Sequence, residues 1–309
     1  MMIPRATTER RNAKSCGLDR KSTLEILRVL NREDARVALA VRRELPKIAC
    51  AVDAIVKALR RGGHLFYVGA GTSGRIALLD AAECPPTFGT PPKMVQAIIA
   101  GGTRALRHSA EGAEDSATDG ARDLTHAGVS RHDVVVGITA SGRTPYVLGA
   151  IDFARRRGAV TIGVTANARS PLAQRARIAI APDTGPEAVT GSTRLKAGTA
   201  QKLVLNLLST AAMARLGRVY DNWMVHVALT NRKLCQRGAR ILEEAAGAAP
   251  RAAEHALRQA RHSLPVAIVM LKTGSSAPDA RRWLAQAGGN VRAAIEAAKK
   301  RRGTIGMRK

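Results

Sequence analysis

The chain has 309 residues, of which 45% are hydrophobic, so it can bury the core of one large domain or of two smaller ones. No apolar run approaches the roughly 18 to 20 residues that cross a bilayer, and the N-terminus lacks the apolar segment of a signal peptide. We therefore expect a cytoplasmic protein without a membrane partner. The four cysteines are scattered without a CxxC pair, which argues against a disulfide framework and a zinc site.

The formal net charge of +26 favours an anionic partner, either nucleic acid or a phosphorylated small molecule. Part of this charge lies near the two ends of the chain, and the rest is spread along helices, where it is typical of solvated surface. Aromatic residues make up only 3% of the chain, which leaves few side chains to stack on unpaired bases. These features disfavour nucleic-acid binding as the main role.

Residues 1–62 are predicted to form an N-terminal tail and a helical arm. Ser22 and Glu25 make a capping box that opens a short helix, and Asn31 is placed to cap the next one. Apolar residues then recur at helical spacing to the end of the arm, with Pro46 kinking or dividing the stretch.

From residue 63 to residue 247 the pattern changes to short apolar runs separated by helix-like segments. Buried strands are predicted at 64–70, 95–100, 133–140, 160–166 and 178–182. Helices are predicted at 76–83, 104–110, 144–157, 171–175, 193–216 and 222–246. This alternation predicts an α/β fold with a doubly wound parallel sheet. Residues 248–309, rich in alanine and punctuated by Pro and Gly, predict a small C-terminal helical bundle with a basic tail.

A glycine loop follows the first predicted strand. Gly69, Gly71 and Gly74 form the GxGxxG pattern of a dinucleotide-binding loop. That loop requires an Asp or Glu at the end of the second strand to hold the ribose, and here the second strand ends without one, which disfavours NAD. The hydroxyls of Thr72 and Ser73, beside the N–H groups of a helix N-terminus, instead suit a phosphate or a sugar oxygen. A simple tight turn would show the same pattern.

Two further hydroxyl-rich loops are predicted at the same edge of the sheet. Thr139, Ser141 and Thr144 follow the third strand, and Ser192 and Thr193 precede a long helix. Loops at the carboxyl ends of parallel strands face one crevice near the topological switch point. Because the chain has no P-loop lysine, no HExxH motif and no GxSxG nucleophile, the three loops together indicate a metal-free phosphosugar site.

Carboxylates remain as candidates for acid–base catalysis. Glu83 precedes Cys84-Pro85-Pro86, whose prolines are expected to end the first crossover helix and hold the carboxylate rigidly. Glu114 lies in a polar stretch after the second strand, where loops return to the crevice. From the pattern alone, Glu114 is equally compatible with a solvated surface acid.

Longer motifs around these residues resemble the N-acetylmuramic acid 6-phosphate etherase family. The motifs are 68–75 (VGAGTSGR), 83–90 (ECPPTFGT), 111–116 (EGAEDS), 140–146 (ASGRTPY) and 190–202 (TGSTRLKAGTAQK), and the resemblance spans nearly the whole chain. It implies a sugar isomerase (SIS) domain and a cytoplasmic homodimer with its site near the subunit interface, without metal or organic cofactor. It also implies cleavage of the D-lactyl ether of N-acetylmuramic acid 6-phosphate to N-acetylglucosamine 6-phosphate and D-lactate, a step of amino-sugar catabolism and peptidoglycan recycling.

The resemblance also implies roles for the two glutamates. The family residue matching Glu83 is a proton donor, and the one matching Glu114 is also catalytic. With the sugar ring open, the C1 aldehyde acidifies the C2 proton and permits elimination across C2–C3. We expect Glu114 to remove this proton while Glu83 protonates the departing lactate oxygen and then activates water for addition at C3, and the reverse assignment stays open.

Two other functions are compatible with the same fold. SIS domains also occur in glucokinase regulatory proteins and transcription regulators, so the main alternative is a non-catalytic sugar-phosphate-sensing protein. Against it, the sequence shows no helix-turn-helix module, and a sensor would not need both Glu83 and Glu114. An aldose–ketose isomerase would exchange protons between C1 and C2 without releasing lactate.

Overall fold

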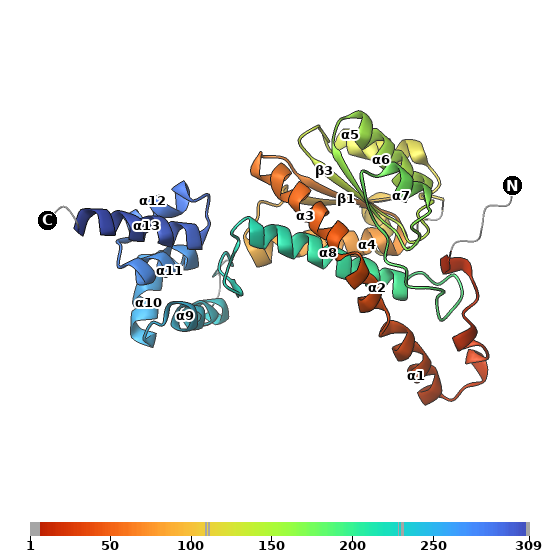
Figure 1. Ribbon diagram of the computed structural model, residues 1–309, viewed down its shortest axis with the longest axis horizontal. Coiled ribbons are helices and arrows are strands. Elements are labelled where there is room, and N and C mark those ends of the chain that lie inside the picture. Colours follow the sequence, from red (N-terminus) through yellow and green to blue (C-terminus); the bar gives the residue numbers. More distant parts are fainter. Residues whose placement is uncertain (1–6, 109, 111, 228, 230–231, 307–309) are drawn as a thin grey trace. The chain divides into compact units, whose positions relative to one another are not determined.

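The computed structural model describes residues 7–108, 110, 112–227, 229 and 232–306. The chain separates into two compact units, Met1–Ala82 with Pro92–Thr210, and Glu83–Pro91 with Ala211–Lys309. The first unit carries a parallel sheet, and the second is mainly helical (Figure 1). None of the helices formed by the described residues is both long and apolar enough to cross a membrane.

The first unit is built on a five-stranded parallel sheet with the strand order β2-β1-β3-β4-β5. The strands are β1 Leu65–Gly69, β2 Val95–Ile99, β3 Val134–Ile138, β4 Val160–Val164 and β5 Ile178–Ile180. Every residue of β1 and β3 is buried. The near-continuous apolar runs predict this burial, because they are typical of a sheet that is covered on both faces. The doubly wound α/β fold is confirmed.

Helices cover both faces of this sheet. On one face lie α3 Leu45–Arg60, α4 Gly71–Phe88 and α8 Lys196–Arg215, and on the other lie α5 Ala117–His126, α6 Pro145–Arg156 and α7 Pro171–Arg175 (Figure 1). Successive side chains of β1 point to opposite faces. Phe66 packs in the core with Ile151 of α6, whereas the Tyr67 hydroxyl donates to Asp80 of α4 at 3.0 Å. Ser209 of α8 donates to the same carboxylate at 3.0 Å, which links α4 to α8.

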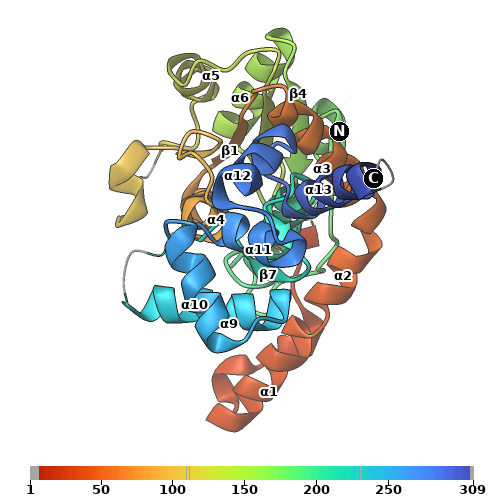
Figure 2. The same ribbon diagram turned by 90° about the vertical axis from the view of Figure 1, so that its left-hand side faces the viewer.

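From residue 7 on, where its description begins, the N-terminal arm forms three short 3-10 turns and two helices before α3. The turns are Thr7–Glu9, Ala13–Ser15 and Leu18–Arg20, and the helices are α1 Thr23–Asp34 and α2 Val37–Arg43. Both views show α1 extending away from the sheet, at the far end of α2 (Figures 1 and 2). Its Leu24 and Leu27 are each 55% exposed.

The capping box of the arm is confirmed, but the boundary predicted after it is wrong. The Ser22 N–H donates to the Glu25 carboxylate at 2.9 Å. Asn31 does not cap a second helix, because α1 continues through it and its carbonyl accepts from Ala35 N at 3.0 Å. Pro46 does divide the stretch: it lies in the first turn of α3, where a missing N–H is tolerated.

The prediction that prolines end the first crossover helix is also wrong. Helix α4 runs past Pro85 and Pro86 to Phe88. The two prolines remove N–H donors only near the end of the helix, and the Pro85 carbonyl still accepts from Gly89 N at 2.9 Å. The helix ends at Gly89, whose φ of 60° suits a glycine after the last turn.

The region after β2 differs from its prediction as well. In place of a helix over 104–110, the chain forms a short 3-10 helix, η4 Gly102–Leu106. Helix α5, for which no helix was predicted, follows at Ala117–His126 and is capped by Ser116, whose hydroxyl accepts from Asp119 N at 3.2 Å. The Ser116–Asp119 spacing was the available sequence signal.

Besides the ends of α4 and α8, the second unit contains a hairpin and five helices within its described residues. The hairpin strands are β6 Val219–Tyr220 and β7 Trp223–Met224, and the helices are α9 Arg232–Ala246, α10 Pro250–Gln259, α11 Leu264–Thr273, α12 Ala277–Gln286 and α13 Val291–Gly306. The single helix predicted over 222–246 is therefore wrong in its first part. Tyr220 pairs with Trp223 across Asp221-Asn222, a dipeptide suited to a tight hairpin turn, and Asp221 has a φ of 53°.

Candidate functional site

The topological switch point of the sheet lies between β1 and β3. The chain passes from β1 outward to β2 and returns to β3 on the other side of β1. Because Gly69 is in register with Ile138, the carboxyl ends of β1 and β3 are side by side. The glycine loop at 69–75 and the second hydroxyl loop at 139–144 therefore start from neighbouring strands, where a ligand crevice is expected.

A cavity of about 400 Å³ opens at the end of β1. Its lining residues come from the glycine loop and from the segment after β2: Ala70, Gly71, Thr72, Arg75, Ala100, Ala105, Ala110, Gly112 and Glu114. The volume is within the range of small-molecule sites. The cavity thus brings together Thr72 and Glu114, two of the residues selected from the sequence.

The glycines allow the loop to fold tightly against the sheet. A Cβ atom on Gly69 would lie 2.8 Å from the backbone nitrogen of Gly74, and one on Gly74 would lie 2.8 Å from Cδ1 of Ile99. Gly71 starts α4 with a φ of 52°. Because the first N–H groups of a helix lack intrahelical partners and carry the positive end of its dipole, the start of α4 offers an anion site at the cavity.

Arg75 brings a positive charge to the cavity wall. Its Nε donates to the carbonyl of Ala105 at 3.1 Å, and a terminal nitrogen donates to the carbonyl of His108 at 3.2 Å. The guanidinium thereby holds the segment around η4 against the glycine loop. Arg75 was not selected from the sequence as a site residue, although it ends the 68–75 motif.

Glu114 is exposed, and its backbone is held by the first turn of α6. Its carbonyl accepts from the N–H of Tyr146 in the first turn of α6, at 3.0 Å. The Tyr146 hydroxyl donates in turn to Asp123 of α5 at 2.6 Å, and burial together with this carboxylate raises the pKa of the phenol. Glu114 is therefore placed at the cavity by the packing of α5 on α6.

The hydroxyls of the second loop bond mainly to one another. Thr139 is buried, with its oxygen 2.8 Å from that of Thr144 and 3.3 Å from that of Ser141. The Ser141 hydroxyl also accepts from Arg143 N at 3.2 Å. These contacts order the loop, and none of the three hydroxyl residues lines the cavity beside Glu114.

The third loop leads into the first turn of α8, which packs against both other loops. Its Ser192 and Thr193 are half-buried. A Cβ atom on Gly198 would lie 3.6 Å from Cγ2 of Thr72, and Ala197 is buried together with Ala140 after β3. The amides of this helix start are occupied, because those at positions 196 and 197 donate to the carboxylate of Glu187, at 3.0 and 2.9 Å.

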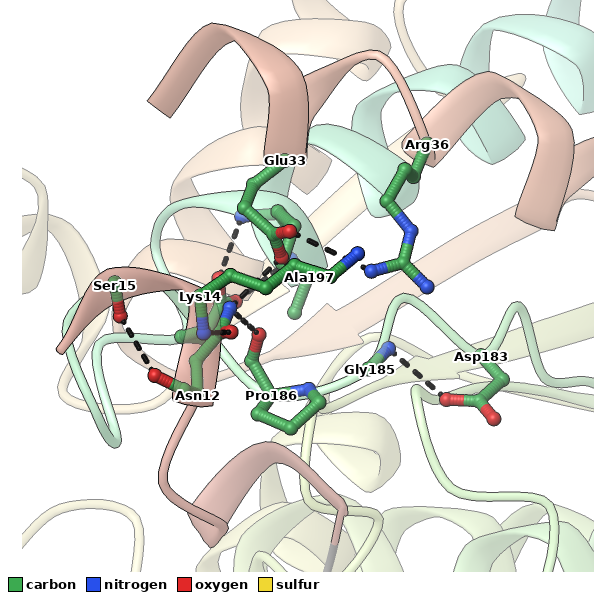
Figure 3. A network of polar contacts seen from close by, with 11 residues as sticks. Asn12, Lys14, Ser15, Glu33, Arg36, Asp183, Gly185, Pro186 and Ala197 are labelled. Carbon is green, nitrogen blue, oxygen red and sulfur yellow. Dashed lines mark hydrogen bonds and ion pairs between the residues drawn. The ribbon is translucent and has the colours of Figure 1, made fainter. Parts of the chain in front are cut away.

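A buried ion pair lies beside this helix start (Figure 3). Lys196 and Glu33 are 1% and 3% exposed, and Nζ lies 2.5 Å from Oε2. Asn12 donates to Oε2 of Glu33 at 2.8 Å and to the carbonyl of Pro186 at 3.1 Å. Burial opposes ionisation of Glu33, but the hydrogen bonds from Lys196 and Asn12 outweigh it and lower its pKa.

These network residues were missed in the sequence. One signal was available, since Glu33 stands four residues after Val29, on the buried stripe of α1. The partner was not recognisable, because Lys196 follows 163 residues later.

Glu83 lies away from the start of its own helix. It is exposed near the end of α4 and is assigned to the second unit. It follows Gly71 by twelve residues, which corresponds to about 18 Å along a regular helix axis. The catalytic role implied for Glu83 therefore stays a prediction.

Comparison with known proteins identifies the family. Residues 47–155 match the glucokinase regulatory protein N-terminal SIS domain, and residues 103–211 match the SIS domain. The phosphoheptose isomerase GmhA from Neisseria gonorrhoeae shares the fold, with a TM-score of 0.50 and 18% identity over 62% of this chain and 100% of that chain.

Two curated relatives are N-acetylmuramic acid 6-phosphate etherases, from Yersinia pestis (strain Pestoides F) and Yersinia pseudotuberculosis serotype O:1b (strain IP 31758). Each is 52% identical over 295 residues, which cover 96% of this chain and 100% of the relative. This likeness confirms the resemblance found in the motifs. The chain belongs to the N-acetylmuramic acid 6-phosphate etherase family.

Proposed function

We propose that this chain is an etherase that cleaves the D-lactyl ether of N-acetylmuramic acid 6-phosphate with water, giving N-acetylglucosamine 6-phosphate and D-lactate. The full-length likeness to curated etherases supports the activity. The observation that carries the site is the cavity that Glu114 lines together with Gly71 and Thr72 at the anion-binding start of α4. The proposed place of action is the cytoplasm, in the recycling of cell-wall amino sugars.

The phosphate and the reacting carbons are proposed to occupy different parts of this cavity. The N–H groups at the start of α4, the Thr72 hydroxyl and the Arg75 guanidinium supply donors and positive charge suited to a phosphate. Glu114 supplies a carboxylate for proton transfer. The hydroxyls of Ser73, Ser141, Thr144, Ser192 and Thr193 are proposed to bind sugar oxygens or to order the loops that do.

The proposed reaction proceeds by elimination and then hydration. In the open-chain sugar, the Glu114 carboxylate takes the C2 proton, the electron pair forms the C2–C3 double bond, and the C3–O bond breaks. The departing lactate oxygen receives a proton from Glu83. Water then adds to the unsaturated aldehyde: its oxygen bonds to C3, Glu83 accepts its proton, and C2 regains a proton from Glu114.

We further propose a homodimer in which Glu83 of a second copy completes the site. The support is the helix geometry: about 18 Å of α4 separates Glu83 from the start of the same helix. The exposed leucines of α1 offer apolar surface for association.

Product analysis tests the reaction. The protein is incubated with N-acetylmuramic acid 6-phosphate in H₂¹⁸O and, separately, in D₂O. We expect lactate release, ¹⁸O at sugar C3 and deuterium at C2. Lactate release with unlabelled C3 would contradict the mechanism, and sugar-phosphate binding without lactate release would favour the sensor. Proton exchange between C1 and C2 without lactate would favour an isomerase.

Substitution of the glutamates tests their roles. We expect Glu114→Gln and Glu83→Gln each to lower kcat by about 10²-fold or more while binding of N-acetylglucosamine 6-phosphate persists. Asp115→Asn is the matched control, since Asp115 is an exposed acid beside Glu114 and should keep wild-type kcat. Wild-type turnover by either glutamate variant would refute that residue's role.

Mixing the two inactive variants tests the shared site. In a heterodimer of Glu83→Gln with Glu114→Gln, a site built from two copies regains both glutamates in one of its two positions. Random reassociation of equal amounts should then restore about a quarter of wild-type activity. If each copy held a complete site, no mixture would regain activity.

A further inference from the structure

The buried pair formed by Lys196 and Glu33 joins the N-terminal arm to the start of α8. Figure 3 shows Glu33 of this pair with Asn12 and with Ala197, the residue after Lys196. We propose that these two residues are positioning residues for the phosphosugar site, which they serve by holding the first turn of α8 and the third hydroxyl loop in register with the glycine loop. This inference rests on the proposed function.

The burial of both charges indicates a geometric role for the pair. Removing two ions from water is unfavourable, and a buried pair often stabilises a fold no better than apolar residues of similar size. A pair of this kind can instead select one arrangement, because each charge is satisfied only by a partner in the right place. Glu33 meets that condition, since its carboxylate accepts from both Lys196 and Asn12, at 2.5 and 2.8 Å.

The connection from this pair to the cavity is short. Lys196 opens α8, and the next two residues of that helix pack against the other loops. Ala197 is buried with Ala140 after β3, and Gly198 lies against Thr72, which lines the cavity. A shift of the Lys196 backbone would therefore move the wall behind Thr72.

The third loop depends on polar contacts at its base. A cavity of about 450 Å³ lies between the N-terminal segment and the start of this loop, lined among others by Ser15, Val189 and Thr190, and Val189 is 50% exposed. Tight apolar packing therefore does not hold this part of the loop. The contacts at its two ends are instead the bond that Asn12 donates to the Pro186 carbonyl and the two bonds that the first amides of α8 donate to the Glu187 carboxylate.

The test compares Glu33→Gln, Lys196→Met and the double variant with the full-length wild type. Glu33→Gln leaves the buried charge of Lys196 without its Glu33 partner, and Lys196→Met leaves the Glu33 carboxylate with only the more distant Arg36, at 3.5 Å. Both single variants are expected to lower Tm. The double variant removes both charges, so its Tm should return toward the wild-type value. Asp34→Asn is the matched control, because Asp34 is an exposed acid next to Glu33.

The decisive readout is the split between KM and kcat in the double variant. We expect KM for N-acetylmuramic acid 6-phosphate to rise by about 10-fold, with kcat within about 3-fold of wild type, because binding at the wall formed by Thr72 is weakened while Glu114 is untouched. The Kd for N-acetylglucosamine 6-phosphate should rise in parallel. Asp34→Asn should change neither constant.

Two outcomes have distinct meanings. A double variant with wild-type Tm, KM and Kd would overturn the positioning role, because the pair would then be dispensable for the site. If the wild type neither cleaves the ether nor binds the product, the proposed function itself fails, and that result is visible before any variant is made.

Discussion

Helices α5 and α6 approach each other so closely that one added methyl group should force them apart. At Gly149 of α6, an added Cβ atom would lie 2.6 Å from the carbonyl carbon and 2.8 Å from the Cα of Ala117, and closer still to its carbonyl oxygen. Carbon atoms in ordinary contact are about 3.5 to 4.0 Å apart. Gly149→Ala must therefore move the start of α5 by roughly 1 Å, since backbone atoms cannot turn aside.

Two opposing effects set the magnitude. Alanine in place of glycine favours a helix interior by about 1 kcal/mol, whereas overpacking of a well-filled contact costs about 1 to 3 kcal/mol. Because the added Cβ meets backbone atoms, the cost of overpacking should lie near the upper end of this range. We therefore expect the free energy of unfolding to fall by about 1 to 2 kcal/mol. For a unit of this size, that loss lowers Tm by about 2 to 8 °C.

The displacement should also reach the site. Ala117 follows Glu114 by three residues, and a shift of about 1 Å in a catalytic group can reduce a rate by about 10²-fold. Thermal unfolding followed by far-UV circular dichroism measures the stability, and lactate release measures kcat/KM. Gly198→Ala is the matched control for stability, because a Cβ there meets its nearest neighbour at an ordinary 3.5 Å.

A Gly149→Ala variant with an unchanged or raised Tm would refute the close packing of α5 on α6. A lowered Tm with unchanged kcat/KM would refute the link from this packing to Glu114. A Gly198→Ala variant as unstable as Gly149→Ala would show that glycine replacement itself, and not the contact, is responsible.

Two predictions concern pH. Burial raises the pKa of Asp80 above 3.8. Ionisation of Asp80 therefore lowers the stability of the folded protein as pH rises above that value. The Tm of Asp80→Asn relative to that of wild type should increase from about pH 4 to about pH 7. A Tm difference that does not change with pH would contradict this reasoning. Burial and the charge of Arg218 lower the pKa of His226 below 6.5, so the second unit should lose stability as pH falls below that value. The fluorescence of Trp223 and Trp283, both in the second unit, measures this loss of stability. The loss should be smaller in His226→Gln. An equal loss of stability in that variant would show that another group causes it.

Local pattern determined much of the fold. The apolar runs of β1 to β5, the Ser22 capping box and the glycines after β1 depend on neighbours close in sequence, and each was recognised from the chain alone. The motifs around Glu83 and Glu114 were long enough to indicate the family. The dipeptide Asp221-Asn222 is a local signal too, because it favours a tight turn at the point where helical spacing predicts the start of a helix.

Only the tertiary structure decided which of the predicted site residues meet. Glu114 lines the same cavity as Thr72 because α5 packs on α6, a contact between helix faces that no spacing reveals. The carboxylate of Glu187 accepts hydrogen bonds from the first amides of α8, and Lys196 is buried against Glu33, 163 residues earlier in the chain. Periodicity and turn chemistry act over a few residues, whereas pairing of buried charges depends on which surfaces the complete fold brings into contact.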